Sequence, residues 1–362
     1  MTQSLSMGVV IRETYTILDK LGEGAFSEVF LVRHRFLGLQ AMKVFKGSSP
    51  APTSEQFNEA FLLSRIAHPN IVRIFEANKI GAQSGERSYV TMEHAAGGTL
   101  HAFLSSRAQL LPEIALRIQQ QICAGLAAAH SQKPAIIHRD VKPQNILLTG
   151  KSADPSVKVA DFGLAKNIDP RLRMVSAAGT LLYMPPEGFH HYETAASDVY
   201  SAGIIFYQLL TGRFPFAIVN STTEQELRLG LAKTRASLPT PPSQVSQGLD
   251  ARYDDVCLQA LQPDLRKRFQ SAGEFLSALE NLEKPDRTPS EPGRNADTSG
   301  EMAGESAARQ AEEKARRAVG MGRQYAELPA AIQLLEEALA DSPSLRGRYG
   351  EVLAKWKSGV IL

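Results

Sequence analysis

The chain has 362 residues, of which 43% are hydrophobic, enough to bury a sizeable core in two or three folding units. Its 40 Lys and Arg residues nearly balance 38 Asp and Glu residues, so charge gives no reason to expect a nucleic-acid or membrane-surface partner. The two cysteines, Cys123 and Cys257, form no C-x-x-C pair, which indicates thiols in a reducing compartment rather than a disulfide or a metal site.

The N-terminus lacks the basic start and apolar core of a secretory signal, and the longest apolar run, near AGIIFYQLL, is far short of the ~20 residues that a membrane helix needs. We therefore expect a cytoplasmic protein without a membrane segment. Residues 1–12 are expected to be an N-terminal extension.

The first folded segment, residues 15–44, has short strand-like patterns around the stretch LGEGAFSEVF. This stretch reads G-x-G-x-x-S, with Ser27 where a third glycine is expected. A dinucleotide-binding turn and a flap over a nucleotide both use this spacing. The dinucleotide turn needs a helix directly after its glycines, whereas strand-like EVFLVRH follows here. The sequence therefore predicts a β-hairpin that can lie over a ligand.

Beyond this hairpin, residues 53–67 are predicted to form a helix, with Thr53 and Gln56 as a capping box. The strand-like segments IVRIFEA and SYVTMEH follow, and GGTL marks a break. After Gly98 the patterns become helical, in LPEIALRIQQQICAGLAAAHSQ, SDVYSAGIIFYQLLTG, DDVCLQALQ and SAGEFLSALENLE. A small β-rich lobe is therefore expected to precede a larger helical lobe.

The C-terminal part divides into a linker and a helical segment. Residues 283–306 are rich in proline and poor in large apolar residues, which predicts a disordered linker. In residues 307–362, Ala331, Leu335 and Ala338 fit the second helix of a tetratricopeptide repeat. The preceding helix fits poorly, so an ordinary helical hairpin remains an equal alternative.

Three motifs occur in order along the predicted helical lobe: IIHRDVKPQNILL, VKVADFGLAK and GTLLYMPPE. A lone H-R-D or D-F-G tripeptide would carry no weight, but the ordered set resembles the eukaryotic-type (Hanks-type) Ser/Thr protein kinase family over residues 13–282. The compact linkers and short lobes look more like a bacterial member than a eukaryotic one. The resemblance implies an α+β, two-lobed kinase fold, with an N-lobe over residues 13–95, a C-lobe over residues 96–282 and a C-terminal helical module.

The resemblance implies transfer of the γ-phosphate of Mg·ATP to Ser/Thr hydroxyls of protein substrates, with autophosphorylation. Asp140 is expected to accept or orient the hydroxyl proton, and Lys142 to meet the transferred phosphate. Lys43 is expected on the α- and β-phosphates, paired with Glu59. Glu55 is the competing partner, but it lies in the first helical turn, where acids often interact only with the helix dipole.

The implied Mg²⁺ ligands are Asn145 and Asp161, which offer the hard oxygen atoms that this ion prefers. Met92 stands at the gatekeeper position between the lobes, while the Glu93 carbonyl and the Ala95 amide are expected to pair with the adenine edge. The remaining ATP-binding residues are expected to be Leu21, Gly22, Glu23, Gly24, Ala25, Phe26, Ser27, Val29, Ala41 and Leu147, together with Lys43.

The resemblance also implies supporting residues in the large lobe. Glu187 and Arg268 match a structural ion pair, and Asp198 matches a residue that braces the catalytic loop. Arg139 would pair with a phosphorylated loop residue, for which Ser176 is the candidate. Three departures from the family pattern, PPE for A-P-E, Tyr200 for tryptophan and Ser27 for glycine, remove no charge or metal ligand.

Two other readings stay open. A pseudokinase scaffold would bind nucleotide and partners without catalysis, but the chain keeps all five charged or metal-binding residues that catalysis requires, namely Lys43, Glu59, Asp140, Asn145 and Asp161. The C-terminal helices could instead carry an added role by binding a protein partner.

Overall fold

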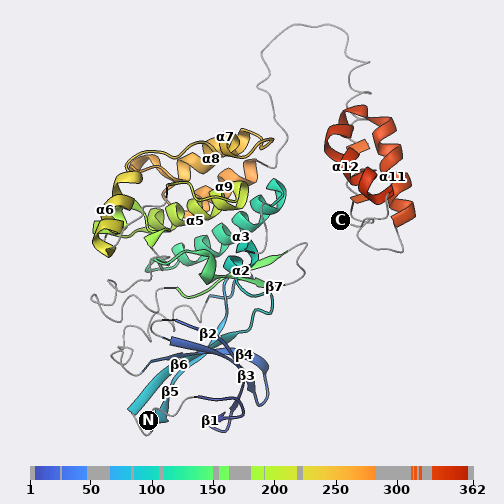
Figure 1. The fold of residues 1–362 in the computed structure, drawn as a ribbon. Coiled ribbons are helices and arrows are strands. Elements are labelled where there is room, and N and C mark those ends of the chain that lie inside the picture. The colour runs from blue at the N-terminus through green and yellow to red at the C-terminus, as the bar shows by residue number, and fades with distance from the viewer. Residues whose placement is uncertain are drawn as a thin grey trace. The chain divides into compact units, whose positions relative to one another are not determined.

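The chain was analysed as a computed structural model that describes residues 5–24, 27–46, 66–82, 85–105, 110–149, 155–162, 181–190, 192–217, 223–282, 311–312, 314–315, 318–319 and 328–357. It divides into two compact units, residues 1–286 and 287–362 (Figure 1). Each unit is described by itself below.

The first lobe is an antiparallel sheet with strand order β1-β2-β3-β4-β6-β5. Alternation of side chains along β3 and β4 gives the sheet two apolar faces. Phe30 and Met42 are buried on one face, while Ala41 is buried on the other beside Met92. The strands are β1 (Val10–Ile11), β2 (Tyr15–Glu23), β3 (Ser27–His34), β4 (Gly38–Phe45), β5 (Ile74–Ala82) and β6 (Gly85–Glu93).

Strand β1 comes from the twelve residues that were expected to precede the fold. It pairs with the start of β2, and Ile11 is only 3% exposed in the core that also holds Tyr15 and Ile17. Residues 10 and 11 are therefore part of the first lobe's sheet.

The second lobe is helical, apart from a two-stranded sheet of β7 (Ile146–Thr149) and β8 (Ser156–Val159). Figure 1 shows its helices gathered on one side of the first lobe's sheet. They are α2 (Leu100–Ser105), α3 (Pro112–His130), α5 (Ala195–Thr211), α6 (Glu224–Thr234), α7 (Pro242–Val245), α8 (Arg252–Ala260) and α9 (Ala272–Asn281).

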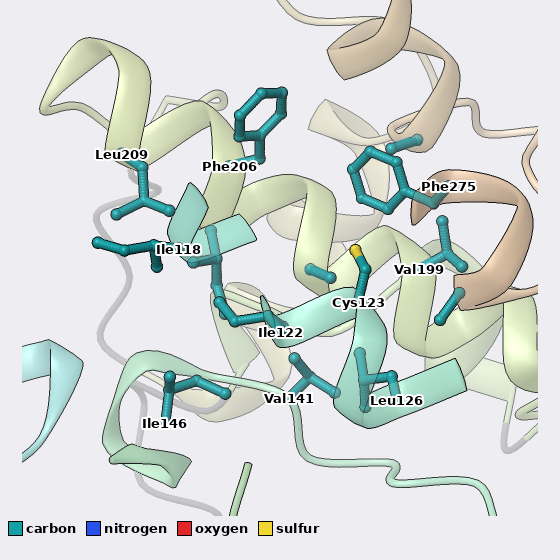
Figure 2. Packing of buried hydrophobic residues seen from close by; sticks show 14 of the residues in the cluster. Ile118, Ile122, Cys123, Leu126, Val141, Ile146, Val199, Phe206, Leu209 and Phe275 are labelled. Carbon is teal, nitrogen blue, oxygen red and sulfur yellow. The ribbon is translucent and has the colours of Figure 1, made fainter. Parts of the chain in front are cut away.

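The core of this lobe forms where α3, α5 and α9 pack together. Figure 2 shows Ile118, Ile122 and Leu126 on successive turns of α3, with Phe206 of α5 and Phe275 of α9 in the same cluster. The four-residue spacing on α3 places these side chains on one stripe, and α5 is buried on nearly all sides.

The four long helical patterns predicted for this lobe are confirmed as α3, α5, α8 and α9. Helix α6 was not predicted from the sequence, although Thr223 and Glu226 form a reciprocal capping box at its start and could have revealed it. The helix predicted over residues 53–67 lies outside the described residues, except for Ile66 and Ala67, which have no regular structure.

The second unit contains α11 (Leu328–Asp341), a 3-10 turn (Pro343–Leu345) and α12 (Arg346–Lys357). The three positions that suggested a repeat helix, Ala331, Leu335 and Ala338, are fully buried in a small core with Trp356. An amphipathic helix is therefore present, and its identity as a tetratricopeptide repeat stays a prediction. The predicted linker lies outside the described residues.

Gly125 on α3 offers a test of how closely this helix packs. A Cβ atom there would lie 2.5 Å from the Asn70 carbonyl oxygen and 3.0 Å from a Val159 methyl group. We expect Gly125→Ala to lower the free energy of unfolding by about 1–3 kcal/mol, because backbone must move to admit the methyl group. Urea denaturation measures the change.

The matched control is Gly273→Ala on α9, where the nearest atom would be 3.7 Å away. This substitution is expected to be neutral or slightly stabilising, because alanine favours helix more than glycine does. Equal stability of the Gly125→Ala variant and the original chain would contradict the close packing.

Candidate active site

The loop between α3 and β7 is fixed by hydrogen bonds to one buried carboxylate, that of Asp198. Asp198 Oδ2 accepts the His138 amide at 2.7 Å, and Oδ1 accepts the Arg139 amide at 2.8 Å. The His130 ring lies 2.9 Å from Oδ2. Burial by itself would raise the pKa of Asp198, but the bonds and charges around it, led by His130, hold that pKa below its usual value. The predicted brace on this loop is confirmed.

Asp140 lies in this loop with two side-chain partners. Lys142 Nζ lies 2.9 Å from Asp140 Oδ2, and Asn145 Nδ2 donates to the Asp140 carbonyl at 2.8 Å and to Oδ2 at 3.1 Å. The Asn145 amide nitrogen thus fixes Asp140, which leaves the amide oxygen as the atom suited to a metal ion. Three residues predicted to act in one reaction are therefore within bonding reach of each other.

His138 connects Asp140 to the segment that carries Asp161. Its Nε2 lies 2.9 Å from the Ala160 carbonyl, and its Nδ1 accepts the Asp140 amide at 3.3 Å, so the ring is the Nε2-protonated neutral form. Burial lowers the pKa of His138. The Phe162 ring packs against it with centroids 4.5 Å apart.

Lys43 and Asp161 form an ion pair across the two lobes, with Nζ 2.8 Å from Oδ1. Lys43 is buried on β4, and Asp161 follows β8. Burial by itself would raise the pKa of Asp161, but Lys43 outweighs it and the net shift is downward, so the carboxylate stays charged. Glu59, the predicted partner of Lys43, lies outside the described residues, as does Glu55.

The donors at Asp161 and Asn145 fit a magnesium ion. A carboxylate and an amide oxygen are hard ligands, and Mg²⁺ usually takes only one or two protein groups beside phosphates and water. Among the described residues no group of three or more His, Cys, Asp and Glu side chains could hold a metal by itself.

The apolar residues predicted around adenine come from both lobes. Ala41 and Met92 are buried in one cluster, and Val29 and Leu147 pack against it. Leu21 is 46% exposed and lies outside this cluster.

The Glu93 side chain contacts Lys158, with Oε2 3.1 Å from Nζ, and Ala95 follows just after β6. A pocket behind Met92 is also lined by Asp161 and Phe162. The described part of the predicted adenine site is thus a largely apolar region, and Asp161 of the Lys43–Asp161 ion pair lies at its edge.

The hairpin of β2 and β3 contains the two glycines of the predicted flap. The packing around these residues does not require glycine at either position. A Cβ on Gly22 would meet nothing within 4 Å, and one on Gly24 would meet only the Ser27 carbonyl at 3.8 Å. Glu23, the last residue of β2, pairs with Lys20 and Lys46, and Ser27 is buried. Ala25 and Phe26 lie outside the described residues.

The predicted ion pair of the large lobe is present. Arg268 Nη1 lies 2.7 Å from Glu187 Oε1, and both side chains are almost fully buried. The Arg268 guanidinium also lies over the Tyr200 ring, 4.7 Å from its centroid, so tyrosine supports the packing at this position. Ser176 lies outside the described residues, and Arg139 lies 3.8 Å from Glu193.

A second pocket lies beside Asp140, and the sequence did not predict all of its walls. Its lining includes Asp140, Val141, Tyr183, Met184 and Pro185. The segment Leu181–Met184 is held by Arg235, a residue to which no motif assigned a role. No helix in the described part of the chain has the length and hydropathy to cross a membrane.

The fold and this group of residues define a two-lobed phosphotransferase, and comparisons with known proteins give the family. The protein kinase domain family matches residues 15–281. The chain belongs to the protein kinase family.

Named relatives are Ser/Thr protein kinases from bacteria and plants. The chain is 32% identical to Ser/Thr-protein kinase PknB of Mycobacterium leprae, over 74% of this chain and 43% of the relative. It is 35% identical to Ser/Thr-protein kinase ATG1a of Arabidopsis thaliana, over 56% of this chain and 32% of the relative. The chain thus spans less than half the length of these curated relatives.

A solved structure shares the fold. The crystal structure of the Mycobacterium tuberculosis PknI kinase domain matches with a TM-score of 0.56 and 26% sequence identity. The match covers 77% of this chain and 99% of that kinase domain. The family match and this structural likeness agree that the chain contains a protein kinase domain.

The lowered pKa of His138 predicts a pH effect on stability. Because burial favours the neutral ring, the unfolded chain binds a proton more readily than the folded chain as the pH falls below the ordinary value of 6.5. Stability should therefore fall with pH there, by at most about 1.4 kcal/mol per pH unit from this residue. Urea denaturation at pH 7.5 and 5.5 measures the loss.

In His138→Phe the loss between these pH values should be smaller by about 1 kcal/mol, whatever the variant's stability at pH 7.5. His101→Asn, at an exposed histidine on α2, should keep the original loss. An unchanged loss in His138→Phe would show that another group sets the pH dependence.

Proposed function

We propose that this chain is an active Ser/Thr protein kinase that transfers the γ-phosphate of Mg·ATP to serine and threonine hydroxyls of proteins, itself included. The observation that carries the proposal is the joined group of Asp140, Asn145, Lys142, Asp161 and Lys43. Hydrogen bonds through His138 and Ala160 connect its two halves. The group contains an acceptor for a proton, two oxygen ligands for a cation and two cations for phosphate oxygens.

Asp140 is the group that would orient and deprotonate the attacking hydroxyl. One of its oxygens is held by Lys142 and Asn145, so the carboxylate has a fixed direction before substrate arrives. Pre-set geometry is what this reaction needs, because phosphoryl transfer depends on alignment and charge stabilisation more than on covalent catalysis. Lys142, beside that carboxylate, would stabilise the negative charge on the phosphoryl group during its transfer.

Lys43 and the glycine hairpin would hold the triphosphate of ATP. Lys43 is buried and already faces Asp161, so it can meet phosphate oxygens without first being drawn out of water. The empty space beside Gly22 and Gly24 supports a close approach by backbone amides, because nothing within the described chain requires glycine there. Val29, Ala41, Met92 and Leu147 would contact the adenine ring.

Asn145 and Asp161 would hold Mg²⁺ through the amide oxygen and the carboxylate. When bound, the ion would supply positive charge that neutralises the phosphates. Asp161 already holds a negative charge beside Lys43. The lowered pKa of Asp161 keeps it anionic.

The proposal extends to the whole chain. Protein substrates, rather than small molecules, are supported by the named Ser/Thr protein kinase relatives and by the pocket beside Asp140. We propose a cytoplasmic location and a protein-binding role for residues 307–362. The alternative, a scaffold that binds nucleotide without catalysis, would have no need of the fixed Asp140.

Purified protein with Mg·ATP is expected to phosphorylate itself and myelin basic protein, as measured by radiolabel transfer. Asp140→Asn and Lys43→Met should each lower the rate by at least ~100-fold, because the first removes the proton acceptor and the second a phosphate cation. Asp255→Asn and Lys267→Met make the same chemical changes at exposed sites and should leave the rate unchanged.

Full ATP binding by the original chain without transfer to either substrate would instead support the scaffold. Equal activity in the Asp140→Asn variant would remove that residue from the mechanism. Phosphosite mapping by mass spectrometry then shows whether Ser176 is modified.

Deletion of residues 283–362 is expected to leave basal ATP turnover intact. The chain divides at residue 286, and the protein kinase family matches residues 15–281, which lie within the first unit. Turnover and thermal unfolding of the truncated chain measure the effect. Loss of the fold on truncation would show that the second unit is an integral brace.

A further inference from the structure

Arg235 ends helix α6, and its guanidinium points into the large lobe with only 1% of the residue exposed. Its Nη2 donates to the carbonyl of Leu181 at 2.9 Å and to that of Leu182 at 2.7 Å, and its Nη1 donates to the Met184 carbonyl. Three main-chain acceptors from one short segment therefore converge on one side chain from elsewhere in the chain.

The charge of Arg235 has no acidic partner in the described part of the chain. Among the described residues no carboxylate forms an ion pair with it, and its surroundings include the rings of Phe189 and Phe216, at 5.5 and 5.9 Å from the guanidinium carbon. Burial lowers the pKa of Arg235 to about 10, so the group remains charged at neutral pH. The carbonyl oxygens are thus its main source of compensating negative potential.

The segment that Arg235 holds is also a wall of the pocket beside Asp140. Tyr183, Met184 and Pro185 line that pocket together with Asp140. The remaining carbonyl of the segment, that of Tyr183, accepts the Ser201 hydroxyl at 2.7 Å. Four consecutive carbonyls, from Leu181 to Met184, are therefore fixed by side chains of the large lobe.

We propose that Arg235 is a positioning residue for the protein substrate: it fixes the backbone of Leu181–Met184 so that the pocket beside Asp140 keeps the shape that receives the chain bearing the acceptor hydroxyl. This inference rests on the proposed kinase function. Arg235 touches neither Asp140 nor any residue predicted to bind ATP, so it acts through the segment and on one substrate only.

A purely structural role makes a different prediction. A buried arginine that only fills space would, when replaced, lower stability and reduce the apparent kcat in proportion to the folded fraction, with both Michaelis constants unchanged. A positioning role instead changes the Michaelis constant for the protein substrate and not that for ATP, because only the affinity for protein depends on the Leu181–Met184 segment. The ratio between the two Michaelis constants therefore distinguishes the roles.

The experiment measures steady-state kinetics of the full chain with myelin basic protein and Mg·ATP. Arg235→Met should raise KM for myelin basic protein by ~10-fold or more, because several charge-assisted hydrogen bonds are lost together. KM for ATP should change by less than about twofold. Arg235→Lys can reach fewer carbonyls than the forked guanidinium and should give an intermediate KM for the protein substrate.

Arg266→Met is the matched control, because its guanidinium is 90% exposed on the same lobe and it should leave both Michaelis constants unchanged. Thermal unfolding of each variant gives the folded fraction. If Arg235→Met does not fold, the Arg235→Lys result decides.

An unchanged KM for myelin basic protein in Arg235→Lys and in any folded Arg235→Met would overturn the proposal. So would a lower kcat that tracks the folded fraction with both Michaelis constants unchanged. Absence of phosphate transfer by the original chain is a separate outcome: it refutes the proposed kinase function, and this inference falls with it.

Discussion

Asp198 lies buried near the start of α5, and its carboxylate accepts the consecutive amides of His138 and Arg139. Arg139 has a φ angle of 66°, in the left-handed region that non-glycine residues rarely occupy. The two hydrogen bonds to a charged acceptor offset that unfavourable backbone. Since nearly every residue of α5 is buried, the loop that contains His138 and Asp140 is anchored to the core of the large lobe.

This anchor extends to both halves of the site through His138. The ring joins the Asp140 amide to the Ala160 carbonyl, so the positions of Asp140 and Asp161 are set by a single neutral side chain. Each of these acids already faces a lysine, Lys142 or Lys43. The charges of these four side chains are therefore already paired within the protein, which offsets part of the cost of withdrawing them from water.

The parts of this site that could be predicted are the residues whose side chains lie in short, recognisable sequence motifs. Asp140, Asn145 and Asp161 were predicted because the family's motifs fix their spacing, and the Glu187–Arg268 pair because the resemblance assigns both residues. The strands were found because alternation along β2, β3 and β4 matches their two faces. Helix α6 was missed because its short amphipathic pattern, interrupted by Gly230, is weak without its capping box.

Arg235 could not have been found in this way. Its partners are main-chain carbonyls, which every residue has, so no residue type at Leu181, Leu182 or Met184 signals the contact. Only the folded path, which brings the end of α6 against a segment some fifty residues earlier, places donor and acceptors together. Hydrogen bonds from a side chain to distant main-chain carbonyls are visible in the folded structure and leave no motif in the sequence.

Two buried arginines in the described part of the large lobe show what this difference in partners means. Arg268 also donates to main-chain carbonyls, those of Gln262 and Ala196, but its charge is balanced by the Glu187 carboxylate. The charge of Arg235 is compensated by peptide dipoles, which point at the guanidinium only while Leu181–Met184 keeps its present conformation. The Arg268 pair therefore stabilises the lobe, whereas Arg235 favours one particular conformation of the segment beside Asp140. An interaction whose strength depends on the conformation of the pocket wall is suited to setting the shape of that pocket.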